Sequence, residues 1–504
     1  MTGRMRFANC FIAMSTGVMM STYAGAGTIG VDVLTPPAPG DATGSLPQGP
    51  QALVLAQSLQ ALTEGRFADA EALARTVTEE QPDLAQGWYL LGLALANLDR
   101  VDEALTALRN SADLYTANAQ PLVISGDLLR ALGRVEEAQA AYAEAVQRDP
   151  SNWQAQDGLG TVLGAKGDQE AALAHFRAAV DAAPAGETDP ALHLAVALLR
   201  AGQPEEAAKV LAPAAALPDA PPPVLETAAR AALGAGESDA ARGYFQRIAD
   251  GGQSPAGRLG LAEMALKAGD TAAAESELSA AREEYPKSIE VLSQLANLYG
   301  AMRRYEAALE VYSEALALAP GNPALIKGAS LAEMRLGRLD AAADRAESLA
   351  ARPGATGADL AWLATLREMQ GKPEAARASY ERAIEMQPDN WLALNNLAAL
   401  TTEDDPARAL DLAERAQKLA PDIPAVMDTL AWAAFRAGDV GQAARLYEKL
   451  HAGAPQDPVI AYRLGLVRLA QGQREEGRSL IEAALRTDPA FRYADEAKAA
   501  LAGD

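Results

Sequence analysis

The sequence predicts an all-α solenoid of about thirteen helix-turn-helix units that stack along the chain. The first observation behind this prediction is a marker residue that recurs every 34 residues, with a single step of 33. The markers are Pro82, Thr116, Pro150, Pro184, Pro218, Gly252, Pro286, Pro320, Gly354, Pro388, Pro421, Pro455 and Pro489. A period in this range is typical of repeated supersecondary units, which bury their apolar faces only against their neighbours.

The second observation is a small residue that is followed, in many units, by a bulky residue four positions later. The small residues are Ala70, Ala104, Ala138, Ala172, Ala240, Ala274, Ala308, Ala342, Ala376 and Ala443. The bulky residues are Leu108, Tyr142, Phe176, Tyr244, Leu278, Tyr312, Tyr380 and Tyr447. We expect the small residue to face the first helix of its hairpin, where a larger side chain would overpack. The bulky residue then fills the space between successive units.

Glycines between the two expected helices of many units are the third observation. They include Gly65, Gly133, Gly167, Gly269, Gly337, Gly438 and Gly472. Glycine accepts the positive φ that ends a helix at a tight turn. The marker prolines then end the second helix, because proline lacks an amide donor and clashes with the preceding turn.

One unit shows the whole pattern, with Trp88, Leu91 and Gly92 in its first helix and Ala104 and Leu108 in its second. This spacing resembles that of the tetratricopeptide repeat (TPR) family over residues 51–491. The resemblance implies a right-handed superhelix whose first helices line a concave groove, with positions 2, 5, 9 and 12 of each unit facing a ligand. The units are expected to start at residues 51, 85, 119, 153, 187, 221, 255, 289, 323, 357, 391, 424 and 458, and residues 492–504 are expected to form a closing helix.

Residues 1–26 have the pattern of a secretory signal peptide. Arg4 and Arg6 precede an uncharged apolar stretch, and the small residues at 24–26 suit a cleavage site. The alternative is an uncleaved membrane anchor, although the stretch is short for a span of ~20 apolar residues. Cleavage would remove Cys10, the only cysteine, and would place the protein in the periplasm or outside a Gram-negative cell.

Residues 27–50 are rich in proline and glycine and are expected to form an extended linker. Two further Pro/Gly stretches, at 217–223 and 351–357, lie within the array. They predict either joints between sub-arrays or longer turns in one continuous superhelix.

The charge of the chain argues against two classes of partner. It carries 44 basic and 67 acidic residues, and loss of Arg4 and Arg6 leaves 42 against 67, a net charge of −25. Such a chain repels nucleic acid phosphates and anionic membrane surfaces. We therefore expect no nucleic acid partner, and no integral membrane segment after signal cleavage.

Catalytic patterns are scarce in the sequence. His175, His193 and His451 lie in separate units, without metal-ligand spacing. Neither a Gly-rich phosphate loop nor a Gly-x-Ser-x-Gly elbow is present. The sequence therefore predicts no cofactor, no metal and no enzymatic activity.

The groove positions implied by the resemblance supply the candidate binding residues. Only eight of these positions are charged: Asp127, Arg130, Asp157, Glu263, Glu290, Lys327, Glu368 and Asp428. We select twelve candidate protein-binding residues, eleven from the groove positions and Asn396 from position 6. They are Tyr89, Asp127, Arg130, Asp157, Asn297, Lys327, Asn395, Asn396, Asp428, Trp432, Phe435 and Tyr462. Exposed aromatic side chains would anchor a partner segment. The alternative for Trp432 and Phe435 is packing against a neighbouring unit.

The predicted function is a non-enzymatic scaffold in the periplasm that binds protein segments in the groove. The stretch from Asn390 to Ala398 is similar to repeats of bacterial envelope TPR proteins, which implies a partner in polysaccharide export or another envelope assembly. One alternative is a carbohydrate-binding module or a hydrolase that uses Asp127, Asp157 and Glu263. A second alternative is a soluble tether of an outer-membrane export complex.

Overall fold

The computed structural model describes residues 50–502, which contain 27 α-helices and no strand. The predicted signal peptide and all of the predicted linker before Pro50 lie outside the described residues. The chain divides into two compact units, between Asp270 and Thr271, and each is described separately.

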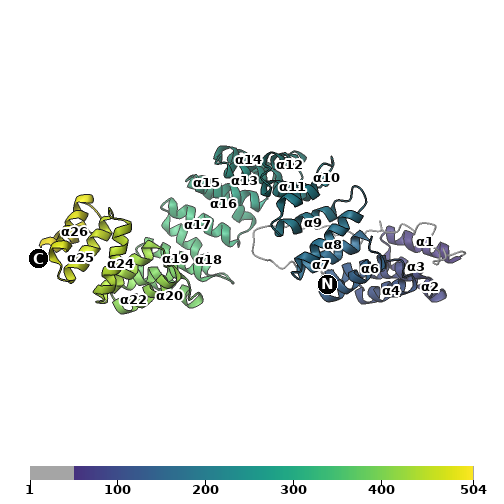
Figure 1. Cartoon of the computed structure of the whole chain (residues 1–504), viewed down its shortest axis with the longest axis horizontal. Coiled ribbons are helices and arrows are strands. Elements are labelled where there is room, and N and C mark those ends of the chain that lie inside the picture. Colours follow the sequence, from purple (N-terminus) through teal and green to yellow (C-terminus); the bar gives the residue numbers. More distant parts are fainter. Residues whose placement is uncertain (1–49, 503–504) are drawn as a thin grey trace. The chain divides into compact units, whose positions relative to one another are not determined.

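The first unit contains thirteen helices, which form six hairpins followed by one further helix (Figure 1). Their bounds are α1 (Pro50–Thr63), α2 (Phe67–Glu80), α3 (Ala85–Asn97), α4 (Val101–Leu114), α5 (Gln120–Ala131), α6 (Val135–Arg148), α7 (Trp153–Ala165), α8 (Gln169–Ala182), α9 (Asp189–Arg200), α10 (Pro204–Ala215), α11 (Pro222–Gly234), α12 (Ser238–Gly251) and α13 (Ala256–Lys267).

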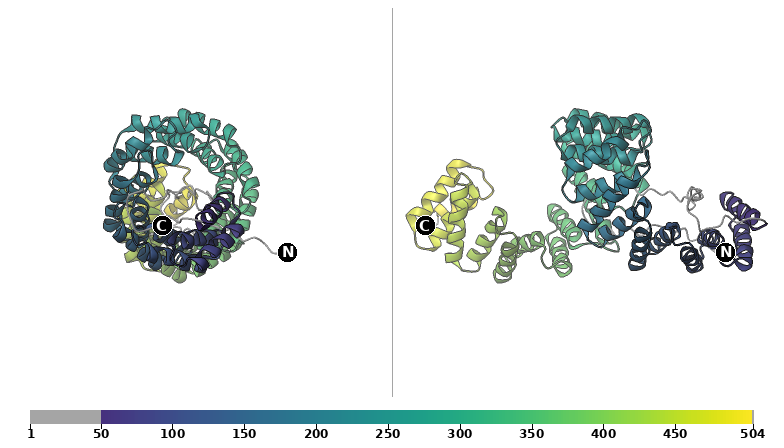
Figure 2. Two further views of the ribbon diagram at one scale, coloured as in Figure 1. Left: turned by 90° about the vertical axis from the view of Figure 1, so that its right-hand side faces the viewer. Right: turned by 45° about the vertical axis from the view of Figure 1, so that its right-hand side comes forward.

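The second unit begins with α14 and ends with a short helix, α27. Its helices are α14 (Thr271–Glu284), α15 (Ile289–Ala301), α16 (Tyr305–Leu318), α17 (Pro323–Arg335), α18 (Leu339–Ala350), α19 (Gly357–Met369), α20 (Pro373–Met386), α21 (Trp391–Thr401), α22 (Pro406–Leu419), α23 (Pro424–Arg436), α24 (Val440–Gly453), α25 (Pro458–Ala470), α26 (Arg474–Thr487) and α27 (Ala494–Ala502). Within each unit, each helix packs on the next helix along the chain, and first helices of successive hairpins, such as α1 and α3 or α21 and α23, also contact each other. Figure 2 shows the hairpins following one another within each unit. The prediction of an all-α solenoid is confirmed.

The core of each hairpin forms around the predicted small and bulky residues. Ala104, Ala138 and Ala376 are completely buried, and so are the rings of Tyr142 and Tyr380. Because each ring packs between its own hairpin and the next one, the core runs along the chain. The predicted turn glycines also have the expected backbone, with φ between 70° at Gly65 and 91° at Gly438.

The predicted register is wrong by one residue in two hairpins, those of α9–α10 and α11–α12. Ala240 is exposed and Tyr244 is only half-buried, whereas Ala241 and Phe245 fill the core positions. The spacing of the small residues explains the shift, because Ala207 lies 35 residues after Ala172. The marker prolines do not reveal this shift, because a proline ends a helix but does not determine which side chain enters the core.

The two Pro/Gly stretches that predict joints are both crossed by continuous core. One apolar cluster extends from α8 to α13 and includes Ala220. Another joins α18 to α19 through Ala346 and Leu363. The division between the compact units lies at neither stretch, and a bend at either remains a prediction.

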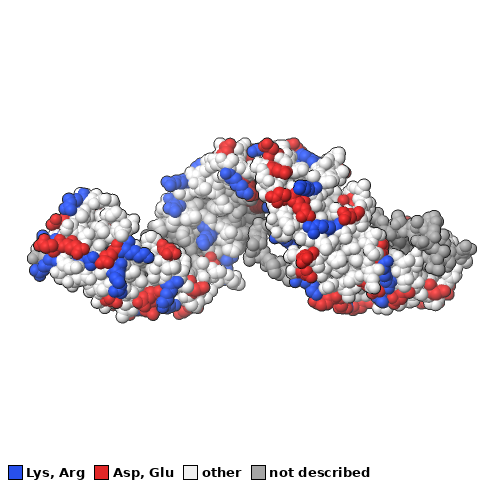
Figure 3. Space-filling model, in the orientation of Figure 1, with Lys and Arg blue, Asp and Glu red and all other residues white. Residues whose placement is uncertain are grey.

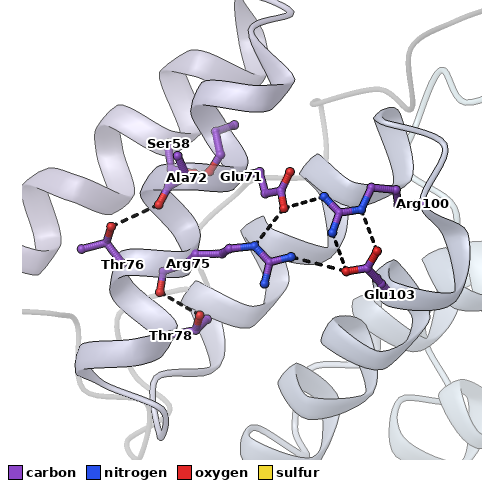
Figure 4. A network of polar contacts seen from close by, with 9 residues as sticks. Ser58, Glu71, Ala72, Arg75, Thr76, Thr78, Arg100 and Glu103 are labelled. Atoms are coloured by element: carbon purple, nitrogen blue, oxygen red, sulfur yellow. Dashed lines mark hydrogen bonds and ion pairs between the residues drawn. The ribbon is translucent and has the colours of Figure 1, made fainter.

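The helix-B side of the array, formed by the second helices of the hairpins, carries many of the charges. Acidic side chains follow the edge where α2, α4 and α6 lie (Figure 3). The side chain of Asp102 on α4 is 92% exposed. Ion pairs join successive hairpins there: Arg100 bonds Glu71 at 2.7 Å (Figure 4). Exposed ion pairs of this kind contribute little to stability, because water and salt screen the charges. None of the described helices is both long and apolar enough to cross a membrane.

Candidate functional site

The predicted binding residues lie on the first helices of the hairpins, and we call the surface of these helices the helix-A face. In the first unit, this face carries a polar cluster around Asp127 on α5. Tyr142 donates its hydroxyl hydrogen to Asp127 Oδ1 at 2.6 Å, and Arg130 Nη2 lies 3.7 Å from the same oxygen. In the next two hairpins, His193 Nδ1 lies 2.8 Å from Oδ2 of Asp157. The structure thus brings together the predicted residues Asp127, Arg130 and Asp157.

Burial and charge act against each other in this cluster. Burial raises the pKa of Asp127, and the nearby charge of Asp157 adds to the rise, although Tyr142 and Arg130 partly offset it. Burial alone lowers the pKa of His193, but its hydrogen bond to Asp157 and the Asp157 charge outweigh burial, so that this pKa is raised. The Asp157 carboxylate thus favours the charged form of His193.

In the second unit, a chain of hydrogen bonds connects α19, α20 and α21. Asn395 Nδ2 donates to Asn396 Oδ1 at 3.1 Å, and Asn396 Nδ2 donates to the Tyr380 hydroxyl at 3.0 Å. The Tyr380 hydroxyl contacts Thr365 Oγ1 at 3.1 Å and Glu368 Oε2 at 3.4 Å. The predicted residues Asn395 and Asn396 are therefore linked directly. Asn395 Oδ1 is buried without a partner, which costs ~1–3 kcal/mol.

The last two hairpins hold an arginine among aromatic rings. Arg463 bonds both carboxylate oxygens of Asp428, at 2.8 and 2.7 Å. Its guanidinium carbon lies 4.7 Å from the ring centre of Trp432 and 5.3 Å from that of Tyr493. Arg463 Nη1 makes both bonds to the carboxylate, and such charge-assisted hydrogen bonds and cation–π contacts hold the partners in fixed positions. Asp428 and Trp432 are therefore brought together by Arg463.

Three predicted anchors are less accessible than expected. Tyr89, Tyr462 and Asn395 are each more than nine-tenths buried. Tyr462 is covered because the rings of Phe491 and Tyr493 lie 5.8 and 5.9 Å away, between the last hairpin and α27. Position 5 of the repeat is thus partly a packing position.

The remaining predicted residues keep part of their surface. Trp432 and Phe435 are half-buried and their ring centres lie 5.4 Å apart, so packing within the hairpin accounts for part of each ring. Asn297 is exposed and accepts a hydrogen bond from Tyr312, and Lys327 is exposed on α17.

Sequence reasoning missed the role of the tyrosine hydroxyls, which it assigned to the core. The rings are buried, but the hydroxyls reach the helix-A face in both units. A signal was available, since a polar residue lies 15 positions before each of Tyr142, Tyr312 and Tyr380. His193 was missed because the register error moved it away from position 6, the position that Asn396 and Arg463 occupy in their hairpins.

In two hairpins the preceding tyrosine ring leaves no room for a side chain at position 6. A Cβ at Gly158 would lie 2.4 Å from the Tyr142 ring, and one at Gly328 would lie 2.4 Å from Tyr312. A side chain of any size at these positions would displace a packed aromatic ring. At Gly158 and Gly328 the preceding ring thus lies against the backbone, whereas Asn396 and Arg463 stand at position 6 after the buried rings of Tyr380 and Tyr447.

Comparison with protein families agrees with this geometry. A tetratricopeptide repeat model matches residues 55–119, 125–187, 227–289 and 363–424, and related models of the same repeat match 189–213, 289–322 and 434–501. The matched segments of the first model alone cover half of the chain. The chain belongs to the tetratricopeptide repeat family. Repeats of this family make it a protein-interaction scaffold.

Two curated relatives match part of this TPR protein. They are Protein O-mannosyl-transferase TMTC1 of Mus musculus, 32% identical over 149 residues, and its counterpart of Homo sapiens, 32% identical over 151 residues. Each match covers 28% of this chain, and 16% and 17% of those proteins, respectively. The chain thus spans about a sixth of the length of these relatives.

Solved structures similar to this TPR protein include the Cut9–Hcn1 hetero-tetramer of the APC/C, at 13% identity and a TM-score of 0.42, covering 90% of this chain and 96% of that one. A tetratricopeptide repeat protein from Parabacteroides merdae matches at 17% identity and a TM-score of 0.38, covering 50% and 98%. Yeast Tom70 matches at 14% identity and a TM-score of 0.34, covering 83% and 95%. At such scores the likeness says nothing about function.

Proposed function

We propose that this TPR protein is an exported scaffold that holds partner polypeptides against its helix-A face, in the periplasm or outside the cell. The setting we propose is the assembly or secretion of an envelope component such as a polysaccharide. Export is supported by the sequence pattern of residues 1–26, and the setting by the resemblance of residues 390–398 to envelope TPR proteins.

One observation supports the scaffold most directly: hydrogen-bonding groups recur at fixed places along the helix-A face. Tyr142, Tyr312 and Tyr380 have buried rings, and their hydroxyls bond polar residues of this face. Groups that packing already holds lose little entropy when they bind a partner. A partner segment would therefore find a prearranged surface.

A photo-crosslinking experiment tests the binding face. Leu331 on the helix-A face and Leu318 at the end of the helix-B helix α16 are both 43% exposed. A photoreactive amino acid is placed at either position in the cell. We expect a discrete crosslinked polypeptide from position 331 and none from position 318. Equal capture from both positions, or capture from 318 alone, would show that the helix-A face is not the binding surface.

A carbohydrate-binding module or hydrolase remains the alternative function, because Asp127 and Asp157 lie close enough for one charge to shift the pKa of the other. Glu263, the third carboxylate of this alternative, lies on α13 and pairs there with Lys267 at 2.8 Å. Binding to a glycan array that is lost in Asp127→Asn and Asp157→Asn would favour this alternative. The transferase activity in the names of the matched relatives is not part of either proposal. A tether of an outer-membrane export complex would use the same scaffold.

A further inference from the structure

The first described helix, α1, has no charged side chain on any of its sides, although it lies at the end of its unit (Figure 1). Leu53, Val54 and Leu55 are consecutive, so they point in directions about 100° apart around the helix axis. Leu55 belongs to the hairpin core, whereas Leu53 is 62% exposed. The exposed side also holds Ala56, Gln57 and Gln60, which are uncharged. Helices without a charged face are normally covered on both sides.

Leu53 occupies a repeat position that is buried in every later hairpin. The equivalent residues, all buried, are Gly87, Pro121, Ala155, Pro190, Val224, Gly257, Val291, Leu325, Asp359, Ala393, Val426 and Ile460. They pack on the hairpin before their own: a Cβ at Gly87 would lie 3.0 Å from Val77 of α2, and one at Gly257 would lie 2.4 Å from the backbone nitrogen of Ala249 of α12. Since no described hairpin precedes α1, Leu53 presents the same contact surface without a covering element among the described residues.

The last hairpin of the second unit, in contrast, has a covering element of its own. The short helix α27 buries Ala494 and Ala497, and it leaves Asp495, Glu496 and Lys498 exposed on its outer side. Repeat arrays need such a polar outer face on their terminal elements to remain soluble. The uncharged outer side of α1 does not supply one, which indicates that a further element covers it.

The chain carries a suitable segment directly before α1, in residues that lie outside the described part. Ile29, Val31 and Val33 alternate with other residues, a pattern typical of an extended segment with one apolar side. Residues 35–49 connect this segment to α1, and fifteen residues can span about 50 Å. Because α1 is about 21 Å long, the connection can reach any point along it. The expected signal cleavage after residue 26 would leave the segment on the chain.

Two physical arguments favour this segment over a second copy of the protein. Each copy carries a net charge of −23, which opposes self-association, whereas Asp32 is the only charge in residues 28–34. A segment joined by a short connection is also present at an effective concentration of about 1 mM. The covering element is therefore expected from the same chain.

We propose that residues 28–34 cover the outer side of α1 in the same molecule, with Ile29, Val31 and Val33 against Leu53 and Ala56. The backbone and Asp32 would then face water and close this end of the unit. This inference goes beyond the proposed function and does not depend on it.

Intramolecular photo-crosslinking tests the contact in the full chain. A benzophenone amino acid replaces Leu53 or, as a matched control, Leu114 on α4, an apolar residue of the same unit that is 44% exposed. Protein labelled with ¹⁵N is mixed with unlabelled protein, so that mass spectrometry separates crosslinks within one molecule from crosslinks between two. The crosslinks from position 53 are then compared in Val31→Asp and Leu34→Asp, which place the same charge on opposite sides of the segment.

We expect position 53 to crosslink to residues 28–34 of the same molecule, and position 114 not to do so. Val31→Asp should reduce the crosslink yield about tenfold, because a carboxylate cannot be buried against Leu53 without a partner. Leu34→Asp should leave the yield unchanged. By hydrogen exchange, the amides of α1 should exchange about fivefold faster in Val31→Asp than in Leu34→Asp, because a terminal helix opens more readily once it is uncovered. Exchange in α7 should be the same in both.

Each other outcome overturns the inference. Crosslinks from position 53 that join ¹⁵N and unlabelled molecules would show that a second copy covers α1. Crosslinks to any other part of the chain, or none at all, would show that residues 28–34 do not lie there. Equal yields and equal exchange in Val31→Asp and Leu34→Asp would show that the segment has no apolar side against α1. Both substitutions lie outside the hairpins, so their folding does not limit the test.

Discussion

Gly260 on α13 offers a sensitive test of how one hairpin packs on the next. A Cβ at Gly260 would lie 2.3 Å from two carbons of the Phe245 ring, which is 3% exposed and therefore has no room to move. Alanine in place of glycine inside a helix stabilises it by ~1 kcal/mol. Overpacking in a core costs ~1–3 kcal/mol. For Gly260→Ala we therefore expect a net loss of up to ~2 kcal/mol.

Gly243 in the interior of α12 is the matched control, because nothing lies within 4 Å of an added Cβ there. Gly243→Ala should stabilise the protein by ~0.5–1 kcal/mol. The difference between the two variants isolates the clash, since both gain the same helix propensity. Long repeat arrays can unfold in parts, so urea denaturation should be accompanied by hydrogen exchange at the amides of α12 and α13. If Gly260→Ala proves as stable as Gly243→Ala, the packing of the Phe245 ring against α13 is wrong.

Three further predictions concern charged groups. Arg463→Met should cost ~1–3 kcal/mol in urea denaturation, because the Asp428 carboxylate loses the guanidinium that bonds both of its oxygens; an unchanged midpoint would refute the pairing. The raised pKa of His193 means that its pair with Asp157 stabilises the fold fully at low pH and loses this contribution as the pH rises through that raised pKa. Titration by NMR should place the His193 midpoint above ~6.5, and Asp157→Asn should abolish the rise. Arg100→Met should lower the urea midpoint only slightly, and less at high salt, so a large shift that salt does not reduce would contradict an exposed ion pair.

The local pattern of the sequence was sufficient for the hairpins themselves. Gly133 and Pro150, for example, mark the turn before α6 and its end, because glycine and proline act on the backbone wherever they occur. Ala138 and Tyr142 occupy the core as predicted, since a small and a large residue on one face of a helix can pack only in a limited number of ways. Such rules depend on neighbours within one or two turns, which the sequence shows directly.

The candidate site depended on contacts between hairpins, and there the repeat positions were an incomplete guide. Tyr462 is covered by Phe491, which lies outside the repeats, and His193 was assigned to the wrong position because one residue is inserted before its hairpin. No periodic pattern shows which way an amide points or which hydroxyl it meets.

The sequence by itself determined the kind of fold, the number of hairpins and the core residues of most of them, because these follow from backbone chemistry and apolar spacing repeated every 34 residues. Only the tertiary structure decided which side chains remain free to bind. Tyr380, Asn396 and Asn395 come from adjacent hairpins, and their hydrogen bonds exist only once those hairpins have stacked. Side-chain partners are set by the packing between units, where a shift of one residue changes every contact.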